Sequence, residues 1–277
     1  MPILASQTSC PRKPRAASLA VAAPICGGAI ALTNSHWSFR PSELCQSLEF
    51  EAVRVLNDFE ALALSLPTLG PADVHKIGGL APEQYATKIV LGPGTGLGVA
   101  GLVWSGERWV AVAGEGGHMS FGAPEELTLL QGLADAGGHL SAEQAISGPG
   151  LAAIYRAMVK SKNRTLSEPI DVVASALAGD AVAGHALGLF TAWLGRFAGN
   201  IALAFGARGG VYIGGGIAPK ITAALSAGSF RAAFEQKGRM SDYLAPIPIY
   251  VILAEFATLK GAASALRGSL TTPIPNA

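Results

Sequence analysis

The sequence predicts an α/β protein with two lobes and a cleft between them. Three observations carry this prediction. Apolar β-type runs dominate the first part of the chain, helical patterns dominate after residue 124, and strands return near residues 210 and 250. A length of 277 residues is enough for one large domain or two smaller ones with a sizeable core.

The composition is that of a globular protein without a strong charge. Half of the residues are hydrophobic, 14% are charged, and the formal net charge is +1. This balance gives no electrostatic reason to expect nucleic acid or an anionic membrane as partner. The cysteines are odd in number and lack metal spacing, so they predict a reducing, cytoplasmic compartment: Cys10, Cys26 and Cys45.

The start of the chain predicts a disordered lead-in over residues 1–16, which contain no acidic side chain and no hydrophobic period. Residues 16–34 are uncharged and follow a basic cluster, as in a signal peptide. Pro24, Gly27 and Gly28 interrupt this stretch. We therefore expect two short strands joined by a Pro-Gly-Gly turn, and no membrane helix.

In the first part, apolar runs rich in β-branched residues predict strands, and Pro67 ends a short helix. The expected strands are residues 17–22, 29–33, 52–56 and 108–113, with a hairpin over 88–104 and a helix over 60–66.

In the second part, start signals accompany the helical spacing. Pro124-Glu-Glu and Pro149 suit first turns, and Ser141-Ala-Glu-Gln144 has the capping-box pattern. The expected helices are residues 124–136, a short one after Ser141, 149–162, 180–207, 217–226 and 259–270, with strands over 210–213 and 246–253.

The hairpin over 88–104 encloses a glycine-rich turn with one hydroxyl, Gly92-Pro-Gly-Thr-Gly-Leu-Gly98. Glycines let a ligand approach backbone N–H groups, so Gly94, Thr95 and Gly96 favour phosphate contact over an ordinary β-turn. The turn lacks Gly-Lys-Ser/Thr and the G-x-G-x-x-G spacing, which excludes a Walker A loop and a Rossmann fingerprint.

Polar residues at three other places are candidate site residues. Asn57-Asp58 ends an apolar strand, where Asp58 would point into a cleft or cap the next helix, the cap being slightly favoured. Glu115 and His118 lie among glycines, in a pattern open to metal ligation, acid–base work, polyol binding or a plain surface turn. Glu143 is a further candidate site residue, and capping of the helix after Ser141 is its alternative role.

A second glycine run, Gly214-Gly215-Gly216, follows a short buried strand and precedes a helix. This position suits a turn on the nucleotide side of an α/β site, and close backbone packing explains it equally well.

Taken together, these segments resemble the bacterial glucokinase family of the actin-like sugar kinases. The resemblance runs in order from about residue 17 to about residue 270, and the set is specific although each piece is weak. The pieces are Leu32-Thr-Asn-Ser-His-Trp37, Leu56-Asn-Asp-Phe59, residues 92–98, Gly114-Glu-Gly-Gly-His118, Ser141-Ala-Glu143, Ser147-Gly-Pro-Gly150, Gly210-Val-Tyr-Ile-Gly-Gly-Gly-Ile217 and residues 230–239.

The resemblance implies an ATP-dependent phosphorylation of D-glucose to glucose 6-phosphate, with ATP and Mg²⁺, on a two-lobed actin-like (ribonuclease H-like) fold. It makes Asp58 the general base. The residues implied to hold the other sugar hydroxyls are Asn57, Glu115, His118 and Glu143. The ATP residues are Gly94, Thr95 and Gly96 in a phosphate hairpin and Gly214, Gly215 and Gly216 beside adenosine.

The resemblance also implies a small lobe over residues 17–115 and a large lobe over 116–270, with the C-terminal helix returning to the small lobe. A homodimer fits the family. The family's first phosphate hairpin, Asp-x-Gly-Gly-Thr, does not occur in this sequence. We therefore expect an incomplete N-terminal lobe with an open sheet edge and impaired ATP binding.

Two alternative functions remain at this stage. A non-catalytic sugar-binding or regulatory relative would keep the sugar residues without turnover. A sugar-responsive repressor of related fold would need a DNA-binding domain and a cysteine-rich zinc site after Gly-Gly-His, and no cysteine follows Cys45.

Overall fold

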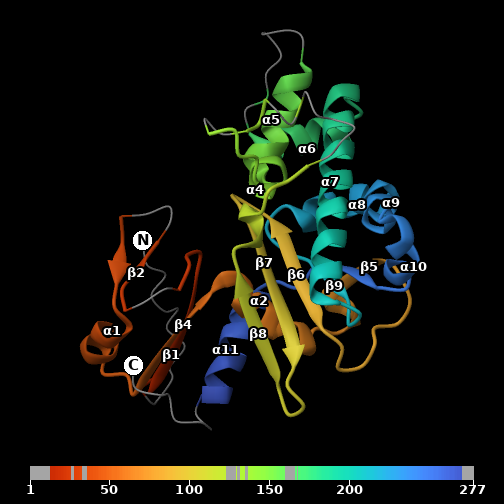
Figure 1. Cartoon of the computed structure of the whole chain (residues 1–277). Coiled ribbons are helices and arrows are strands. Elements are labelled where there is room, and N and C mark those ends of the chain that lie inside the picture. The colour runs from red at the N-terminus through yellow and green to blue at the C-terminus, as the bar shows by residue number, and fades with distance from the viewer. Residues whose placement is uncertain are drawn as a thin grey trace.

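The computed structural model describes residues 13–25, 28–32, 36–122, 129, 132–134, 137–159, 166 and 168–269. Within these residues the protein has a small part built on two parallel strands and a larger part built on a six-stranded mixed sheet (Figure 1).

The small part is formed by the described residues before residue 58. Strands β1 (Ala16–Val21) and β4 (Ala52–Asn57) pair in parallel, with Ala16 opposite Ala52 and Val21 opposite Asn57. The antiparallel pair β2 (Ile30–Ala31) and β3 (Ser38–Phe39) and helix α1 (Pro41–Leu48) complete it. Ala23, Ile30 and Phe39 form its small buried core.

The larger sheet has the strand order β5-β10-β9-β6-β7-β8 among the described strands. Strands β10, β9 and β6 are parallel to one another, and the others run antiparallel to their neighbours. The bounds are β5 Val74–Gly78, β6 Lys88–Pro93, β7 Leu97–Trp104, β8 Trp109–Gly114, β9 Val211–Ile213 and β10 Ile249–Ile252.

Both faces of this sheet are covered by helices, so its central strands are apolar on both sides. In β6, Ile89 and Leu91 belong to the core under helix α7 (Ala181–Phe205), whereas Val90 belongs to the core under helix α2 (Asp58–Ser65). All three side chains are fully buried. A continuous apolar run is typical of such doubly covered strands.

Helix α7 is apolar enough, and at 25 residues long enough, to cross a membrane by length and composition alone. Two thirds of its most apolar window is buried inside the protein, which identifies it as the core helix of the larger part. It begins at the cap Asp180, whose Oδ1 accepts from the N–H groups of Val182 (2.9 Å) and Ala183 (3.0 Å), and it ends at Gly206 with φ 60°.

The remaining helical segments surround α7 or connect the strands, except for α11, which follows the last strand and packs on α2. The α-helices are α4 Ala142–Ala145, α5 Gly148–Met158, α6 Pro169–Leu177, α8 Thr222–Ser226, α9 Ser229–Glu235, α10 Ser241–Leu244 and α11 Ala257–Ser269. Short 3₁₀ segments are η1 Leu66–Thr68, η2 Pro71–Asp73, η3 Gly116–His118, η5 Ala218–Ile221 and η6 Gly238–Met240.

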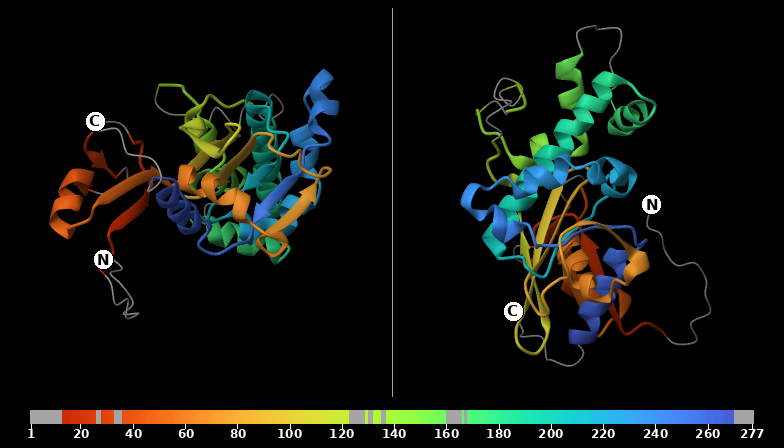
Figure 2. Two further views of the ribbon diagram at one scale, coloured as in Figure 1. Left: turned by 90° about the horizontal axis from the view of Figure 1, so that it is seen from below. Right: turned by 90° about the vertical axis from the view of Figure 1, so that its right-hand side faces the viewer.

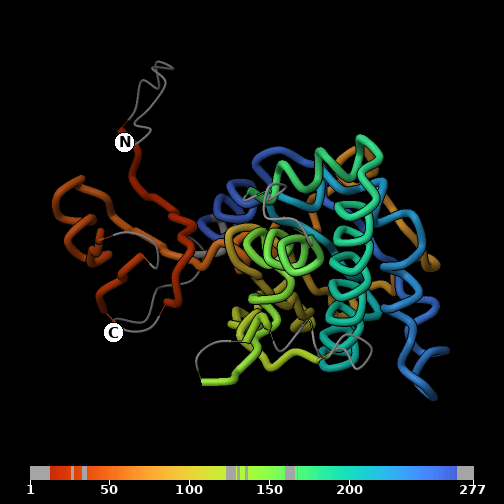
Figure 3. The backbone as a smooth tube through the Cα atoms, turned by 90° about the horizontal axis from the view of Figure 1, so that it is seen from above, coloured from red at the N-terminus to blue at the C-terminus, as the bar shows by residue number. Residues whose placement is uncertain are grey.

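The two parts are joined by helices α2 and α11. Helix α2 packs on the larger sheet, α11 packs on α2, and β1 packs on α11. Figures 2 and 3 show α11, in dark blue, between the small part and the larger sheet. Leu56, Ala61, Ala262 and Ala265 form the buried core at this junction.

Several predicted elements differ from the observed ones. The strand over 29–33 is reduced to Ile30–Ala31 and pairs with the unpredicted β3 instead of β1. The helix expected over 60–66 begins at Asp58, and the helix expected over 217–226 is split into η5 and α8. Residues 1–12 of the lead-in expected over 1–16, and most of the helix expected over 124–136, lie outside the described residues, whereas Ala16 already belongs to β1.

The expected lobe boundary also differs from the sheet topology. Strands β5 to β8, which the sequence prediction assigned to the small lobe, belong to the larger sheet. The reason is the parallel pairing of β6 with β9, in which Ile89 lies opposite Val211. This pairing joins segments more than a hundred residues apart, which no local pattern reveals.

The contact between α11 and α2 depends on Gly261. A β-carbon at this position would overlap the carbonyl oxygen of Ala61, so only glycine allows the two helices to approach this closely. We expect Gly261→Ala to lower the free energy of unfolding by about 1–3 kcal/mol, as overpacking does elsewhere. Urea unfolding of the purified protein measures this loss.

A matched control is Gly184→Ala, because Gly184 lies in helix α7 with open space where its β-carbon would be. This change is expected to raise stability by about 0.5–1 kcal/mol. Equal midpoints for the two variants would contradict the close approach of α11 to α2.

Candidate functional site

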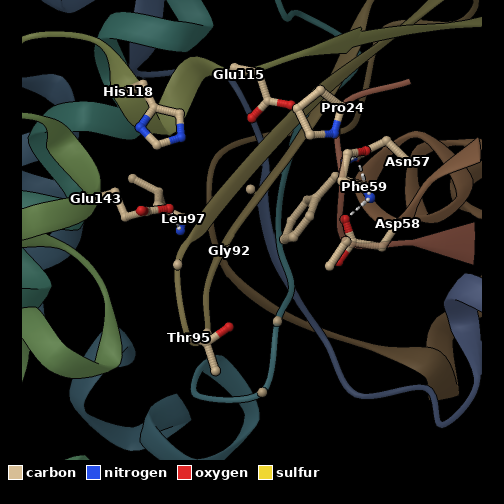
Figure 4. Close-up of a pocket in the computed structure, with 17 residues that line it drawn as sticks. Pro24, Asn57, Asp58, Phe59, Gly92, Thr95, Leu97, Glu115, His118 and Glu143 are labelled. Atoms are coloured by element: carbon tan, nitrogen blue, oxygen red, sulfur yellow. Dashed lines mark hydrogen bonds between the residues drawn. The ribbon is translucent and has the colours of Figure 1, made fainter. Parts of the chain in front are cut away.

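A cavity of about 360 Å³ lies where the small part meets the larger sheet (Figure 4). Its size is within the ~300–1,000 Å³ typical of small-molecule sites. Its walls come from the start of α2, the β6–β7 hairpin, the loop after β8, helix α4 and the loop after β9. The lining residues are Ala22, Ala23, Pro24, Asn57, Asp58, Phe59, Gly92, Gly94, Thr95, Gly96, Leu97, Gly98, Glu115, His118, Glu143, Gly215 and Gly216.

Asn57 and Asp58 enter the cavity from the junction of β4 and α2. The Oδ1 atom of Asn57 accepts from the N–H groups of Phe59 (2.9 Å) and Glu60 (3.3 Å), so Asn57 is the cap of α2. The slightly favoured interpretation of Asp58 as the cap is therefore wrong. The capping is done one residue earlier, and Asp58 is left at the first helical position facing the cavity.

The environment of Asp58 makes it a stronger base than an exposed aspartate. Partial burial raises the pKa of Asp58 above its ordinary value of 3.8, and the negative charge of Glu115 raises it further. The N–H of Phe59, 2.9 Å from the Asp58 Oδ1 atom, works in the opposite direction by stabilising the carboxylate. The net shift is upward.

The glycine-rich turn between β6 and β7 forms the opposite wall. Gly92 pairs with Gly98 and Pro93 with Leu97, and the Gly94 N–H donates to the Gly96 carbonyl at 2.8 Å. The first residue of α5, Gly148, donates its N–H to the Gly94 carbonyl at 2.8 Å. The turn is thus fixed at its base, while Thr95 at its tip is exposed.

Glu143 holds the same turn from the side of α4. One of its carboxylate oxygens, Oε2, accepts the Leu97 N–H at 2.9 Å, and a β-carbon at Gly96 would overlap that oxygen. The capping box of α4 is made by Ser141 and Gln144. Glu143 is therefore not the cap of its helix, and it lines the cavity beside the turn.

Glu115 and His118 come from the loop that follows β8. The His118 N–H donates to the Glu115 carbonyl at 3.0 Å across η3, and both residues line the cavity. Figure 4 shows both side chains on the far side of the cavity from Thr95. Among the described residues there is no group of three His, Cys, Asp or Glu side chains that could hold a metal ion.

The glycine run after β9 has two different roles. Gly215 and Gly216 line the cavity, whereas Gly214 lies outside the residues that form its wall. The Gly214 N–H donates to the Leu91 carbonyl at 2.9 Å, and its own carbonyl occupies the space that a side chain at Gly92 would need. Close strand packing accounts for Gly214.

A second cavity of about 440 Å³ adjoins the first across the glycine-rich turn and shares Gly94, Thr95 and Gly216 with it. Its other lining residues are Gly148, Pro149, Glu168, Pro169, Ile170, Val173, Ile217 and Lys220. Sequence reasoning missed the three of these residues that belong to α6, Pro169, Ile170 and Val173, because the helix itself was not predicted. It also gave no role to Phe59, although the Asn-Asp-Phe motif contained it.

The family model that matches this chain and two similar proteins all carry the name glucokinase. The glucokinase family model matches residues 3–269. The glucokinase of Tolumonas auensis is 44% identical over 263 residues, covering 93% of this chain and 82% of the relative. The glucokinase of Chelativorans sp. is 45% identical over 259 residues, covering 92% and 76%.

Solved structures agree in fold. The crystal structure of a glucokinase from an Antarctic psychrotroph has a TM-score of 0.79 and 37% identity over 90% of this chain and 79% of that one. A Streptomyces griseus glucokinase of the ROK family, in complex with glucose and AMPPNP, has a TM-score of 0.61 and 21% identity over 86% and 75%, and it supports the fold alone. The predicted actin-like α/β fold is confirmed.

The charge of Glu115 gives a direct test of the site's electrostatics. Because that charge raises the pKa of Asp58, we expect Glu115→Gln to lower this pKa. A ¹³C NMR titration of the Asp58 carboxyl measures it. Glu107→Gln, at the exposed tip of the β7–β8 hairpin, is the control and should leave the pKa of Asp58 unchanged. A wild-type pKa of Asp58 at or below 3.8 would contradict the burial argument.

Proposed function

The chain belongs to the glucokinase family, and on this premise we propose that it transfers the γ-phosphoryl group of ATP to the 6-hydroxyl of D-glucose. One observation carries the proposal. A carboxylate with a raised pKa, four polar side chains suited to hydroxyl groups and a glycine-rich turn suited to phosphate line a single cavity.

The polar side chains are proposed to hold the sugar. The Glu115 carboxylate would accept from two neighbouring hydroxyls, and the Oε1 atom of Glu143 would accept from another. Asn57 uses one amide hydrogen on the Ala23 carbonyl (3.4 Å) and has a second for a sugar oxygen. His118 adds an imidazole on the same side. These groups would fix the hexose and leave its 6-hydroxyl toward Asp58.

Asp58 is proposed to act as the general base. The 6-hydroxyl proton passes to the Asp58 carboxylate while the hydroxyl oxygen bonds to the γ-phosphorus. The bond between the γ-phosphorus and the oxygen that bridges it to the β-phosphorus breaks, and that oxygen leaves with ADP. The products are glucose 6-phosphate and ADP, and the proton then leaves Asp58 for solvent. Phosphoryl transfer needs mainly positioning and charge stabilisation, which a fixed carboxylate and a fixed turn provide.

ATP is proposed to lie across the glycine-rich turn. Its phosphates would meet Thr95 and the backbone N–H groups of the turn, and its adenosine would enter the second cavity beside Ile170, Val173 and Ile217. The neighbouring Streptomyces griseus protein was crystallised with AMPPNP, an ATP analogue, which supports this choice of donor. Because the two cavities share this turn as a wall, the phosphate end of ATP would meet the sugar in the first cavity.

Mg²⁺ is proposed to enter as part of the substrate Mg·ATP. The described residues offer no three-ligand cluster, and Mg²⁺ commonly keeps several waters and binds through substrate phosphates with few protein carboxylates. It would neutralise charge on the phosphates during transfer, while the protein's residues hold the sugar and the proton.

A coupled assay with glucose 6-phosphate dehydrogenase tests the activity of this chain with glucose and Mg·ATP. Asp58→Asn is expected to lower kcat by about 10²–10⁴-fold because the base is lost, with a much smaller change in KM for glucose. Asp242→Asn, an exposed residue of α10, is the charge-matched control. Wild-type glucose binding by calorimetry without any turnover would instead support the non-catalytic sugar-binding alternative.

The nucleotide cavity is tested separately through Ile170, which is half exposed and can be shortened without emptying the core. We expect Ile170→Ala to raise KM for ATP several-fold, because apolar contact with the adenine ring is lost, and to leave KM for glucose unchanged. Leu177→Ala, on the same helix but outside the cavity, is the control. A rise in KM for glucose alone would contradict this placement of ATP.

A further inference from the structure

Phe59 directly follows the proposed base and makes a contact that the proposed reaction does not itself use. Its ring lies against the backbone of Gly98 in strand β7, where a β-carbon would overlap three of the ring carbons. Figure 4 shows the Phe59 ring between Asp58 and the strand that carries Leu97. The ring thus joins the start of α2 to the strand that leaves the glycine-rich turn.

The glycine at position 98 is explained by this ring and not by backbone conformation. Gly98 lies in regular antiparallel pairing with Gly92, and it is not among the glycines with positive φ. The backbone at this position would therefore accept alanine. The space is filled by Phe59, whose ring also packs against the buried cluster that contains Leu62, Ala100 and Leu102.

The backbone of Phe59 sets the position of the two polar residues before it. Its N–H donates to the Oδ1 atom of Asp58 at 2.9 Å and to the Oδ1 atom of Asn57 at 2.9 Å. Because the ring and this N–H belong to the same residue, a displacement of the ring also moves the N–H. The orientation of the Asp58 carboxylate and the hydrogen bond that caps α2 then change.

Hydrogen bonds hold the strand against moving away from the ring, because β7 is paired with β6 and β8. On its other side the turn is held by Glu143, whose Oε2 accepts the Leu97 N–H at 2.9 Å, and by Gly148, whose N–H donates to the Gly94 carbonyl. The Phe59 ring is therefore the element that must shift when a side chain is added at position 98.

We propose that Phe59 is a positioning residue for the phosphoryl transfer: its ring, seated on Gly98, sets the distance between the Asp58 carboxylate and the glycine-rich phosphate turn. This inference rests on the proposed function. Asp58 remains the group that touches the substrate, and Phe59 acts through it. The absence of a side chain at Gly98 keeps the base and the turn in register.

A double-mutant cycle tests the proposal with Gly98→Ala, Phe59→Ala and the combined variant. Gly98→Ala is expected to lower kcat by about 10- to 100-fold with KM for glucose changed less than about threefold, because a displacement of about 1 Å has effects of this size. In the Phe59→Ala background the same change is expected to lower kcat by less than about twofold, since the ring is no longer there to be displaced.

Gly101→Ala is the matched control for loss of stability. Gly101 lies in the same strand, and a β-carbon there would come within 2.6 Å of the Phe205 ring on the opposite face of the sheet. This variant is expected to lose stability by thermal unfolding while it keeps kcat within about twofold. If Gly98→Ala behaves as Gly101→Ala does, or if its effect on kcat is equal with and without the Phe59 ring, the proposal is overturned.

A readout without turnover separates this proposal from the proposed function. Loss of the Phe59 N–H from the Asp58 carboxylate removes a stabilisation of its charged form, so Gly98→Ala is expected to raise the pKa of Asp58 in a ¹³C NMR titration. An unchanged pKa would overturn the positioning role even in an inactive protein. Absence of wild-type turnover together with a raised pKa would refute the kinase proposal and leave the positioning contact standing.

Discussion

The close approach of neighbours to the β6–β7 hairpin is the constraint on which the rest of the structure depends. The Gly214 backbone occupies side-chain space at Gly92, Glu143 occupies it at Gly96, and Phe59 occupies it at Gly98. Each neighbour belongs to a different element. Because the hairpin is paired with β9 in the buried sheet, these contacts place Asp58, the second glycine run and α4 around one turn. Two cavities then share that turn as a wall.

Much of the site was predictable because its residues carry local signals. Asp58 follows an apolar strand, and Glu115 and His118 lie among glycines. The hairpin is predicted by two apolar runs on either side of a glycine-rich turn. The structure brings these residues to one cavity. The partners of each side chain were not predictable in the same way. Asn57 rather than Asp58 caps α2, and this choice depends on the extended backbone of Asn57, at φ −61° and ψ 148°.

The sequence predicted the elements that depend on a local hydrophobic pattern, and it missed those that depend on pairing between strands far apart in the chain. Helix α7 follows from its long apolar helical pattern, and the hairpin follows from its glycine-rich turn. Strand β5 was missed because its run Val-His-Lys-Ile-Gly is short and half polar, and it is held by antiparallel pairing with β10. The expected lobe boundary differs from the sheet topology for the same reason, since β6 pairs with the distant strand β9. Helix α6 was missed although Pro169 at its first position is a helix-start signal and Val172 and Val173 are its buried residues, and the second cavity was missed with it.

The packing of α11 on α2 has a consequence for biosynthesis. The ribosome makes α2, with Asp58 at its start, before the helix that covers its Ala61 face, because α11 follows β10 in the chain. During translation that face stays uncovered until α11 has emerged. The packing around α2 is therefore completed only after α11 is made, and nascent chains that stop before Ala257 would expose an apolar surface for chaperones to bind.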